Sequence, residues 1–196
     1  MMLSASEVMA RRLVPEEPLT AMYRESLSIL TRNAGPAELG DYLEFGVYNG
    51  TSLSCMYALV RELGYDNMRF FDCDSFEGLP RDPNKKAETL LRQHPIERAS
   101  VIMVDCDVYS SAVQSLRFAG PHIRDEAAII FDDRFSAGLA DRNMGEKRAF
   151  QEFLAEHPFF DCAEMGGYNA NSLMFHVRRR RSTSRPEGPR RSPSDG

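Results

Sequence analysis

The chain has 196 residues, of which 42% are hydrophobic and 27% are charged. These values predict one soluble globular domain with enough apolar side chain to fill a core. No stretch approaches the roughly 20 uninterrupted apolar residues of a membrane span. The first twenty residues also lack the apolar region and small-residue cleavage site of a secretory signal. We therefore expect a cytoplasmic protein that is not integral to a membrane.

The net charge of −5 is unevenly distributed along the chain. Residues 178–196 hold seven Arg against two acidic residues, so this segment carries +5 and the other 177 residues carry −10. An acidic body disfavours binding to a nucleic-acid backbone. The segment itself contains almost nothing apolar, which predicts a disordered Arg-rich tail. We expect a flexible segment at residues 1–17, a single domain at 18–177 and this tail at 178–196.

Strand-like and helix-like runs alternate along the chain, which predicts a Rossmann-like α/β domain with a mainly parallel sheet and helices on both faces. Helical spacing of apolar residues predicts helices at 18–31, 51–63, 110–118 and 146–156, and a weaker one at 85–93. Strands are predicted at 42–45, 68–72, 100–104 and 127–131. Two late strands, 159–165 and 172–177, predict an antiparallel hairpin around Gly166 and Gly167. Thr51 is the expected N-cap of its helix, and the helix dipole favours Glu146 in a first turn.

Two polar clusters follow the first two predicted strands. The sequence EFGVYNGTS, from Glu44 to Ser52, places two glycines where the chain must turn and where a ligand can approach the backbone. Its spacing matches neither a dinucleotide fingerprint nor a phosphate loop, and a plain strand-to-helix turn explains it equally well. The second cluster, Asp72 to Ser75, suits hydrogen bonds to ribose hydroxyls, or an Asx turn or helix cap.

Asp105, Asp132 and Asp133 directly follow two fully apolar strands. Neighbouring strands lie about 4.8 Å apart, so these carboxylates can converge on one point. Three acids packed together repel one another unless a cation joins them, and carboxylate oxygens suit a hard cation such as Mg²⁺. Helix capping is the alternative interpretation. The four histidines show no metal-ligand spacing, and four widely spaced cysteines without a CxxC pair favour reduced thiols.

Taken in order, LEFGVYNGTS, FDCDSFEGLP, VIMVDCDVYSSA, IIFDD and GEKRAF resemble the class I S-adenosylmethionine-dependent methyltransferases, most closely the macrocin O-methyltransferase (TylF) family. The resemblance covers about residues 40–177. It implies Mg²⁺-assisted O-methylation of a sugar or small natural product that offers a hydroxyl acceptor, and it leaves a homo-oligomer open. It implies Mg²⁺ ligands at Asp105, Asp132 and Asp133. The implied S-adenosylmethionine contacts are Glu44, Gly46, Val47, Tyr48, Gly50, Thr51, Ser52, Asp74 and Ser75.

The chain departs from this family between residues 81 and 99. No β-rich run occurs in this segment, so we expect the third strand of the usual methyltransferase sheet to be absent. Two other functions stay open on the residues alone. A degenerate methyltransferase fold acting as a non-catalytic binding protein is one of them. The other is a Mg²⁺-dependent phosphatase of the haloacid-dehalogenase type, which also uses a DxD at a strand end and a later acidic pair.

Overall fold

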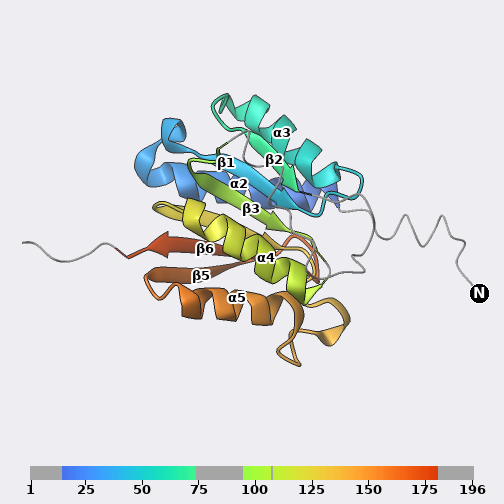
Figure 1. Ribbon diagram of the computed structural model, residues 1–196. Helices are drawn as coiled ribbons and strands as arrows, with labels where there is room; N and C mark the ends of the chain where they lie inside the picture. The colour runs from blue at the N-terminus through green and yellow to red at the C-terminus, as the bar shows by residue number, and fades with distance from the viewer. Residues whose placement is uncertain (1–14, 74–94, 107, 181–196) are drawn as a thin grey trace, which may run out of the picture.

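The computed structural model describes residues 15–73, 95–106 and 108–180 (Figure 1). Several sequence predictions fall outside these ranges: the contacts at Asp74 and Ser75, the weak helix at 85–93, the missing third strand, and most of the two terminal segments. Those predictions stay as they are. Among the described residues, no helix is both long and apolar enough to cross a membrane, and the four cysteines are all free thiols.

Six strands from the described part of the chain form one sheet in the order β2-β1-β3-β4-β6-β5 (Figure 1). The first four pair in parallel, while β6 pairs antiparallel with both β4 and β5. Within the described ranges β2 therefore stands at one edge and the late hairpin at the other. This topology confirms the predicted mainly parallel α/β sheet with its C-terminal antiparallel hairpin. The strands are β1 (Asp41–Phe45), β2 (Phe70–Cys73), β3 (Ala99–Val104), β4 (Glu126–Phe131), β5 (Phe160–Gly166) and β6 (Leu173–Arg179).

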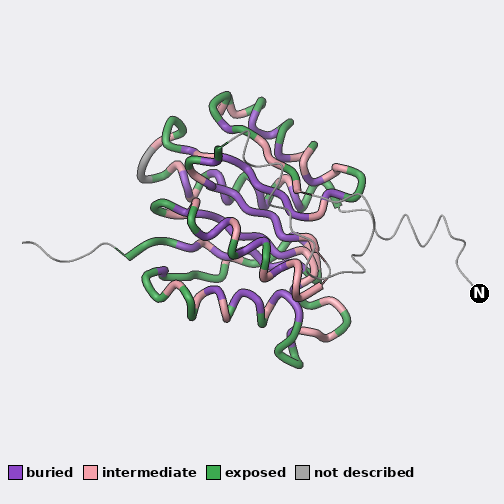
Figure 2. The backbone as a smooth tube through the Cα atoms, in the orientation of Figure 1, coloured by how far each residue is buried: buried purple, intermediate pink, exposed green. Residues whose placement is uncertain are grey.

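Four α-helices of the described residues cover the two faces of this sheet. One apolar cluster joins α4 and α5 to one face, and a second joins α2 and α3 to the other. Figure 2 shows the buried backbone running through the central strands between these layers. Both clusters follow from strands that are apolar on both faces, since β3 is buried at every position. The helices are α2 (Glu16–Ala34), α3 (Thr51–Leu63), α4 (Tyr109–Ala119) and α5 (Gly145–Glu156), with short 3₁₀ turns η1 (Pro36–Glu38), η3 (Gly120–His122) and η4 (Ser136–Gly138).

Helix α3 has the predicted bounds of 51–63, but its N-cap differs from the expected one. Gly50 is its N-cap, with a left-handed φ of 75°, and Thr51 is already the first helical residue. The prediction of Thr51 as the N-cap was therefore wrong. The side chain of Asn49 accepts hydrogen bonds from the backbone nitrogen and the hydroxyl of Thr51, at 3.2 and 2.8 Å. A second left-handed glycine, Gly64 with φ 71°, ends the helix as such residues commonly do.

The first described helix and the last strand extend slightly past residues 18 and 177. Helix α2 starts at Glu16, and β6 continues to Arg179, so Arg178 and Arg179 belong to the sheet. The backbone of Arg179 donates to the carbonyl of Asp125 at 2.7 Å, which anchors this last strand. The late hairpin needs its glycine, because a Cβ on Gly167 would lie 2.0 Å from the carbonyl oxygen of Ser172.

Candidate functional site

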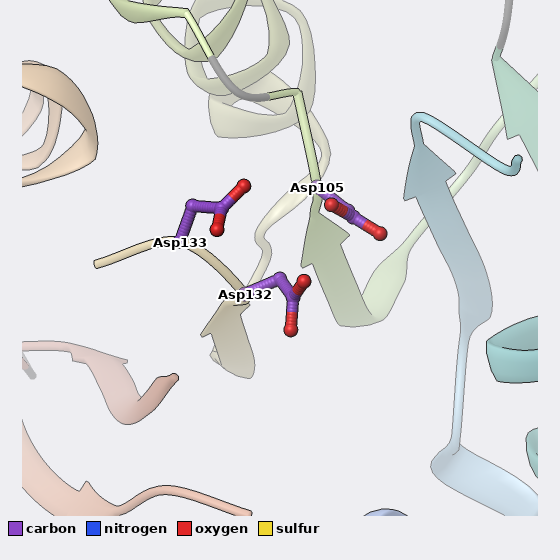
Figure 3. A group of neighbouring side chains, drawn as sticks. All are labelled: Asp105, Asp132 and Asp133. Carbon is purple, nitrogen blue, oxygen red and sulfur yellow. The ribbon is translucent and has the colours of Figure 1, made fainter. Parts of the chain in front are cut away.

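Three aspartates meet where β3 and β4 end (Figure 3). The register of this parallel pair places Val104 opposite Phe131, so the next residues, Asp105 and Asp132, emerge side by side. The backbone of Asp132 donates to the carbonyl of Val104 at 3.1 Å, which holds the two chain ends together. One carboxylate oxygen of each of Asp105, Asp132 and Asp133 lies within 4.8 Å of the others. The structure thus brings together the three residues whose positions after neighbouring strands predicted their convergence.

Neighbouring hydroxyls fix two of these carboxylates. Ser136 donates to Oδ1 of Asp133 at 2.5 Å, and the hydroxyl of Tyr168 donates to Oδ1 of Asp132. Burial, and then the charge of Asp133, raise the pKa of Asp132 to about 6. A cation beside this carboxylate would offset both the cost of burying its charge and the repulsion from Asp133. Three oxygen donors that leave further positions to water fit a hard divalent cation such as Mg²⁺.

The glycine turn lies one strand away from the aspartates, at the same edge of the sheet. Gly46 follows β1 with φ 87°, and a Cβ there would lie 1.8 Å from the backbone oxygen of Asp105. Glycine is therefore required both by the backbone conformation and by the close approach of β3. Tyr48 and Gly50 also have positive φ, 48° and 75°. The turn closes through a 2.8 Å hydrogen bond from Gly50 to the carbonyl of Val47.

Residues of the turn divide into surface and interior positions. Tyr48 is 69% exposed, and Gly46, Gly50 and Thr51 are half-buried. Three other predicted cofactor contacts, Glu44, Val47 and Ser52, are buried.

Glu44 is the centre of a buried hydrogen-bond network beneath the turn. Its Oε2 accepts from the hydroxyl of Tyr42 at 2.8 Å, and its Oε1 accepts from the hydroxyl of Ser52. Tyr42 in turn contacts the hydroxyl of Tyr23, on α2, at 2.9 Å. The network joins α2, β1 and α3, so this carboxylate connects the elements on either side of the turn.

Asp72 lies in the second cluster predicted to face a ligand. It pairs with Glu44 in the parallel register of β1 and β2, close to the carboxyl end of β2, and it is exposed. The rest of this cluster, Asp74 and Ser75, lies outside the described residues. What the structure shows is that Asp72 stands at the same sheet edge as the glycine turn and the aspartates.

Two polar residues near the aspartates carried no sequence signal for this position. Tyr168 reaches Asp132 from the segment between β5 and β6, 36 residues along the chain. Arg134, just after the aspartates, is only 7% exposed, and its guanidinium lies over the rings of Phe131, Phe150 and Phe175. A third residue, Glu146, was predicted at a helix start. The structure places it in the first turn of α5, 3% exposed.

No protein-family model and no curated protein sequence matches the chain. Solved structures do match it. The O-methyltransferase NovP has 16% sequence identity and a TM-score of 0.62, over 83% of this chain and 79% of its own. CalS11, a TDP-rhamnose 3'-O-methyltransferase of calicheamicin biosynthesis, has 16% identity and a TM-score of 0.58, over 90% of this chain and 81% of its own. At this level of identity the likeness establishes the architecture, so the chain has the Rossmann-like fold of the methyltransferases NovP and CalS11.

Proposed function

We propose that this protein is an S-adenosylmethionine-dependent O-methyltransferase of the macrocin O-methyltransferase type, assisted by Mg²⁺. The proposal rests mainly on the contact between the glycine turn and the aspartates. The backbone oxygen of Asp105 stands against Gly46 at a distance that leaves no room for a Cβ. A cofactor on the glycine turn and a cation on the aspartates would therefore be neighbours. Open α/β sheets bind their ligands at this edge, beyond the carboxyl ends of the strands.

The glycine turn suits a cofactor that lies against backbone. Gly46 and Gly50 present no side chain, and Tyr48 between them is exposed. We assign direct contact with S-adenosylmethionine to these three residues and to Thr51. Glu44, Val47 and Ser52 are buried, so in this proposal they act by holding the turn in shape. Asp74 and Ser75 keep their predicted role on the ribose side.

The aspartates suit a divalent cation by donor type and by spacing. Asp105, Asp132 and Asp133 would hold Mg²⁺ through carboxylate oxygens, with Ser136 and Tyr168 fixing the orientation of two of them. Partners of this kind usually set ligand geometry.

Beyond binding the cofactor and the cation, methyl transfer requires mainly that the chain position the acceptor. When bound, S-adenosylmethionine supplies an already activated methyl group, and Mg²⁺ lowers the pKa of a hydroxyl that it coordinates. The residues of the chain bind these groups at adjacent positions and hold the acceptor hydroxyl in line. Positioning of this sort can supply much of a rate enhancement.

The acceptor that we propose is a hydroxylated sugar or small natural product. A cation held by three carboxylates retains positions at which a pair of adjacent hydroxyls can chelate. CalS11 is described as acting on a TDP-linked rhamnose, and its structure shares the fold of this chain.

Calorimetric titration with S-adenosylhomocysteine, with and without Mg²⁺, tests the cofactor half of the proposal. We expect saturable heat at micromolar to millimolar ligand. Absence of heat at millimolar ligand would refute the catalytic proposal and leave a non-catalytic binding protein. Hydrolysis of a general aryl phosphate that Asp105→Asn abolishes would instead favour the phosphatase.

Thermal melting with and without Mg²⁺ tests the cation half. Mg²⁺ should raise the melting temperature of the wild type, and Asp132→Asn or Asp133→Asn should remove this shift. Asp141→Asn is the matched control, because Asp141 is exposed and outside the cluster. Equal Mg²⁺ shifts in all four proteins would contradict the cation site.

A further inference from the structure

Glu146 is a buried carboxylate whose oxygens lack partners. Its side chain is 3% exposed, and within the described part of the chain neither Oε1 nor Oε2 has a hydrogen-bond partner. Buried carboxylates are almost always paired, because transfer of a charge out of water is strongly unfavourable. An orphaned group of this kind indicates a ligand, an ion or ordered water that completes its bonding.

The local sequence forces Glu146 into this position. Gly145, the residue before it, has φ 58°, and a Cβ there would approach the side chain of Leu139 to 3.2 Å. A glycine therefore allows the chain to turn sharply into α5. The same helix then buries Phe150 and Phe153 in the core, which fixes its rotation against the sheet. Glu146 consequently stays inside the protein.

The charged surroundings of Glu146 are the aspartates of the candidate cation site. Burial raises the pKa of the Glu146 carboxyl, the charges of Asp133, Asp105 and Asp132 raise it further, and the charge of Arg134 lowers it. Four acidic residues thus share one partly buried region with one arginine. A divalent cation at the aspartates would bring the formal charge of this group from −3 to −1, which removes most of the mutual repulsion.

Arg134, the residue after Asp133, lies over the ring of Phe150, one turn along α5 from Glu146, and supplies the positive charge of this group. Its guanidinium lies 5.1 to 5.9 Å from the ring centroids of Phe131, Phe150 and Phe175. Its Nε and Nη1 atoms are buried without a hydrogen-bond partner among the described residues. Its charge favours the ionised form of Glu146, yet among the described residues no hydrogen bond joins Nε or Nη1 to a Glu146 oxygen.

We propose that Glu146 is the outer carboxylate of the cation site. Its oxygens accept hydrogen bonds from water molecules bound to the cation that Asp105, Asp132 and Asp133 hold, and Arg134 balances its charge. Glu146 is thus a positioning residue, because it acts on the cation through bound water. Partners in this outer position commonly change metal affinity by about 10- to 100-fold. The inference rests on the cation site of the proposed function.

Titration of the full chain with Mn²⁺, followed by electron paramagnetic resonance of the free ion, measures this role directly and needs no catalysis. We expect Glu146→Gln to raise the Kd for Mn²⁺ by at least about 10-fold. Glu156→Gln, at an exposed acid near the other end of the same helix, should bind as the wild type does. Without metal, Glu146→Gln should melt no lower than the wild type, because it loses a repelled charge and keeps its shape.

The outcomes separate the inference from the proposal beneath it. If the wild type and Asp132→Asn bind Mn²⁺ equally weakly, the cation site itself is refuted and the role of Glu146 with it. If only Asp132→Asn loses Mn²⁺ and Glu146→Gln binds like the wild type, the role of Glu146 alone is refuted. Glu146→Asp covers the case in which the Gln variant does not fold. It keeps the charge, so its affinity should fall between wild type and Asp132→Asn, and a complete loss would overturn the inference.

Discussion

Replacement of Gly46 by Ala tests the contact on which the candidate site depends. A Cβ at this residue would lie 1.8 Å from the backbone oxygen of Asp105 and 2.8 Å from its carbonyl carbon. Both atoms belong to the chain just after β3, so the ends of β1 and β3 must separate. The positive φ of 87° adds strain that any L side chain would meet.

The size of the effect follows from these two contributions. Left-handed backbone costs about 1–2 kcal/mol for a residue with a Cβ, and a forced backbone shift in a packed region costs about 1–3 kcal/mol. We therefore expect Gly46→Ala to lower the free energy of unfolding by about 2–5 kcal/mol. Urea denaturation followed by circular dichroism measures this loss.

Gly35→Ala is the matched control for this experiment. Gly35 has φ 84°, almost the same as Gly46, but nothing lies within 4 Å of its Cβ position. It should lose only the backbone contribution, about 1–3 kcal/mol, because its φ of 84° with ψ 166° is a conformation that only glycine adopts readily. The smaller entropy of the unfolded chain that alanine brings is common to both variants and cancels in the comparison. Equal losses in the two variants would refute the close approach of β1 and β3 as the reason for glycine.

Three further predictions concern the aspartates and the thiols. Tyr168→Phe removes the hydroxyl that donates to Asp132, so the affinity for Mg²⁺, measured by calorimetry, should fall about 10-fold. Tyr57→Phe, at an exposed ring, should leave this affinity unchanged. Equal affinities in the two variants would contradict the orienting role of Tyr168. Burial and the charge of Asp133 raise the pKa of Asp132 to about 6, so the native state binds a proton that the unfolded chain has lost. The stability that this proton contributes is complete below about pH 4 and is lost as the pH rises through about 6. Melting in EDTA should therefore show a decline of about 1–3 kcal/mol over this range that Asp132→Asn lacks, and parallel profiles would be evidence against it. Burial raises the pKa of Cys73 to about 11 and that of Cys106 to about 12. Iodoacetamide at pH 8 should therefore alkylate both thiols at least about 100-fold more slowly in the native protein than in the unfolded chain, as followed by mass spectrometry. Native rates within tenfold of the unfolded rates would contradict this prediction.

The sheet was predictable because its signals are local or repeat along the chain. β3 and β4 are continuous apolar runs, and such runs mark strands that are buried on both faces. The convergence of Asp105 and Asp132 follows from one rule, since parallel strands end at the same edge of a sheet. The position of a helix start is less certain, because Gly50 and Thr51 both suit an N-cap and only the backbone conformation decides between them.

The residues that hydrogen-bond or pack around the site could not be predicted from the sequence. Tyr168 lies 36 residues from Asp132, and Tyr23 lies 19 residues from Tyr42, so each contact exists only after the chain has folded. Arg134 looks like an ordinary loop cation in the sequence, and only the three surrounding phenylalanine rings make it an interior residue. Composition and spacing carry no record of such long-range contacts.

The close approach of Gly46 to Asp105 also bears on how the protein folds. These residues are 59 positions apart, and Asp132 is a further 27 positions along, so no fragment of local sequence contains the cluster and the turn together. Loops of this length close slowly, and the contacts that they join form late. In a refolding experiment the capacity to bind a divalent ion should therefore appear only after β1, β3 and β4 have paired. The appearance of metal binding would then report when the central sheet is complete.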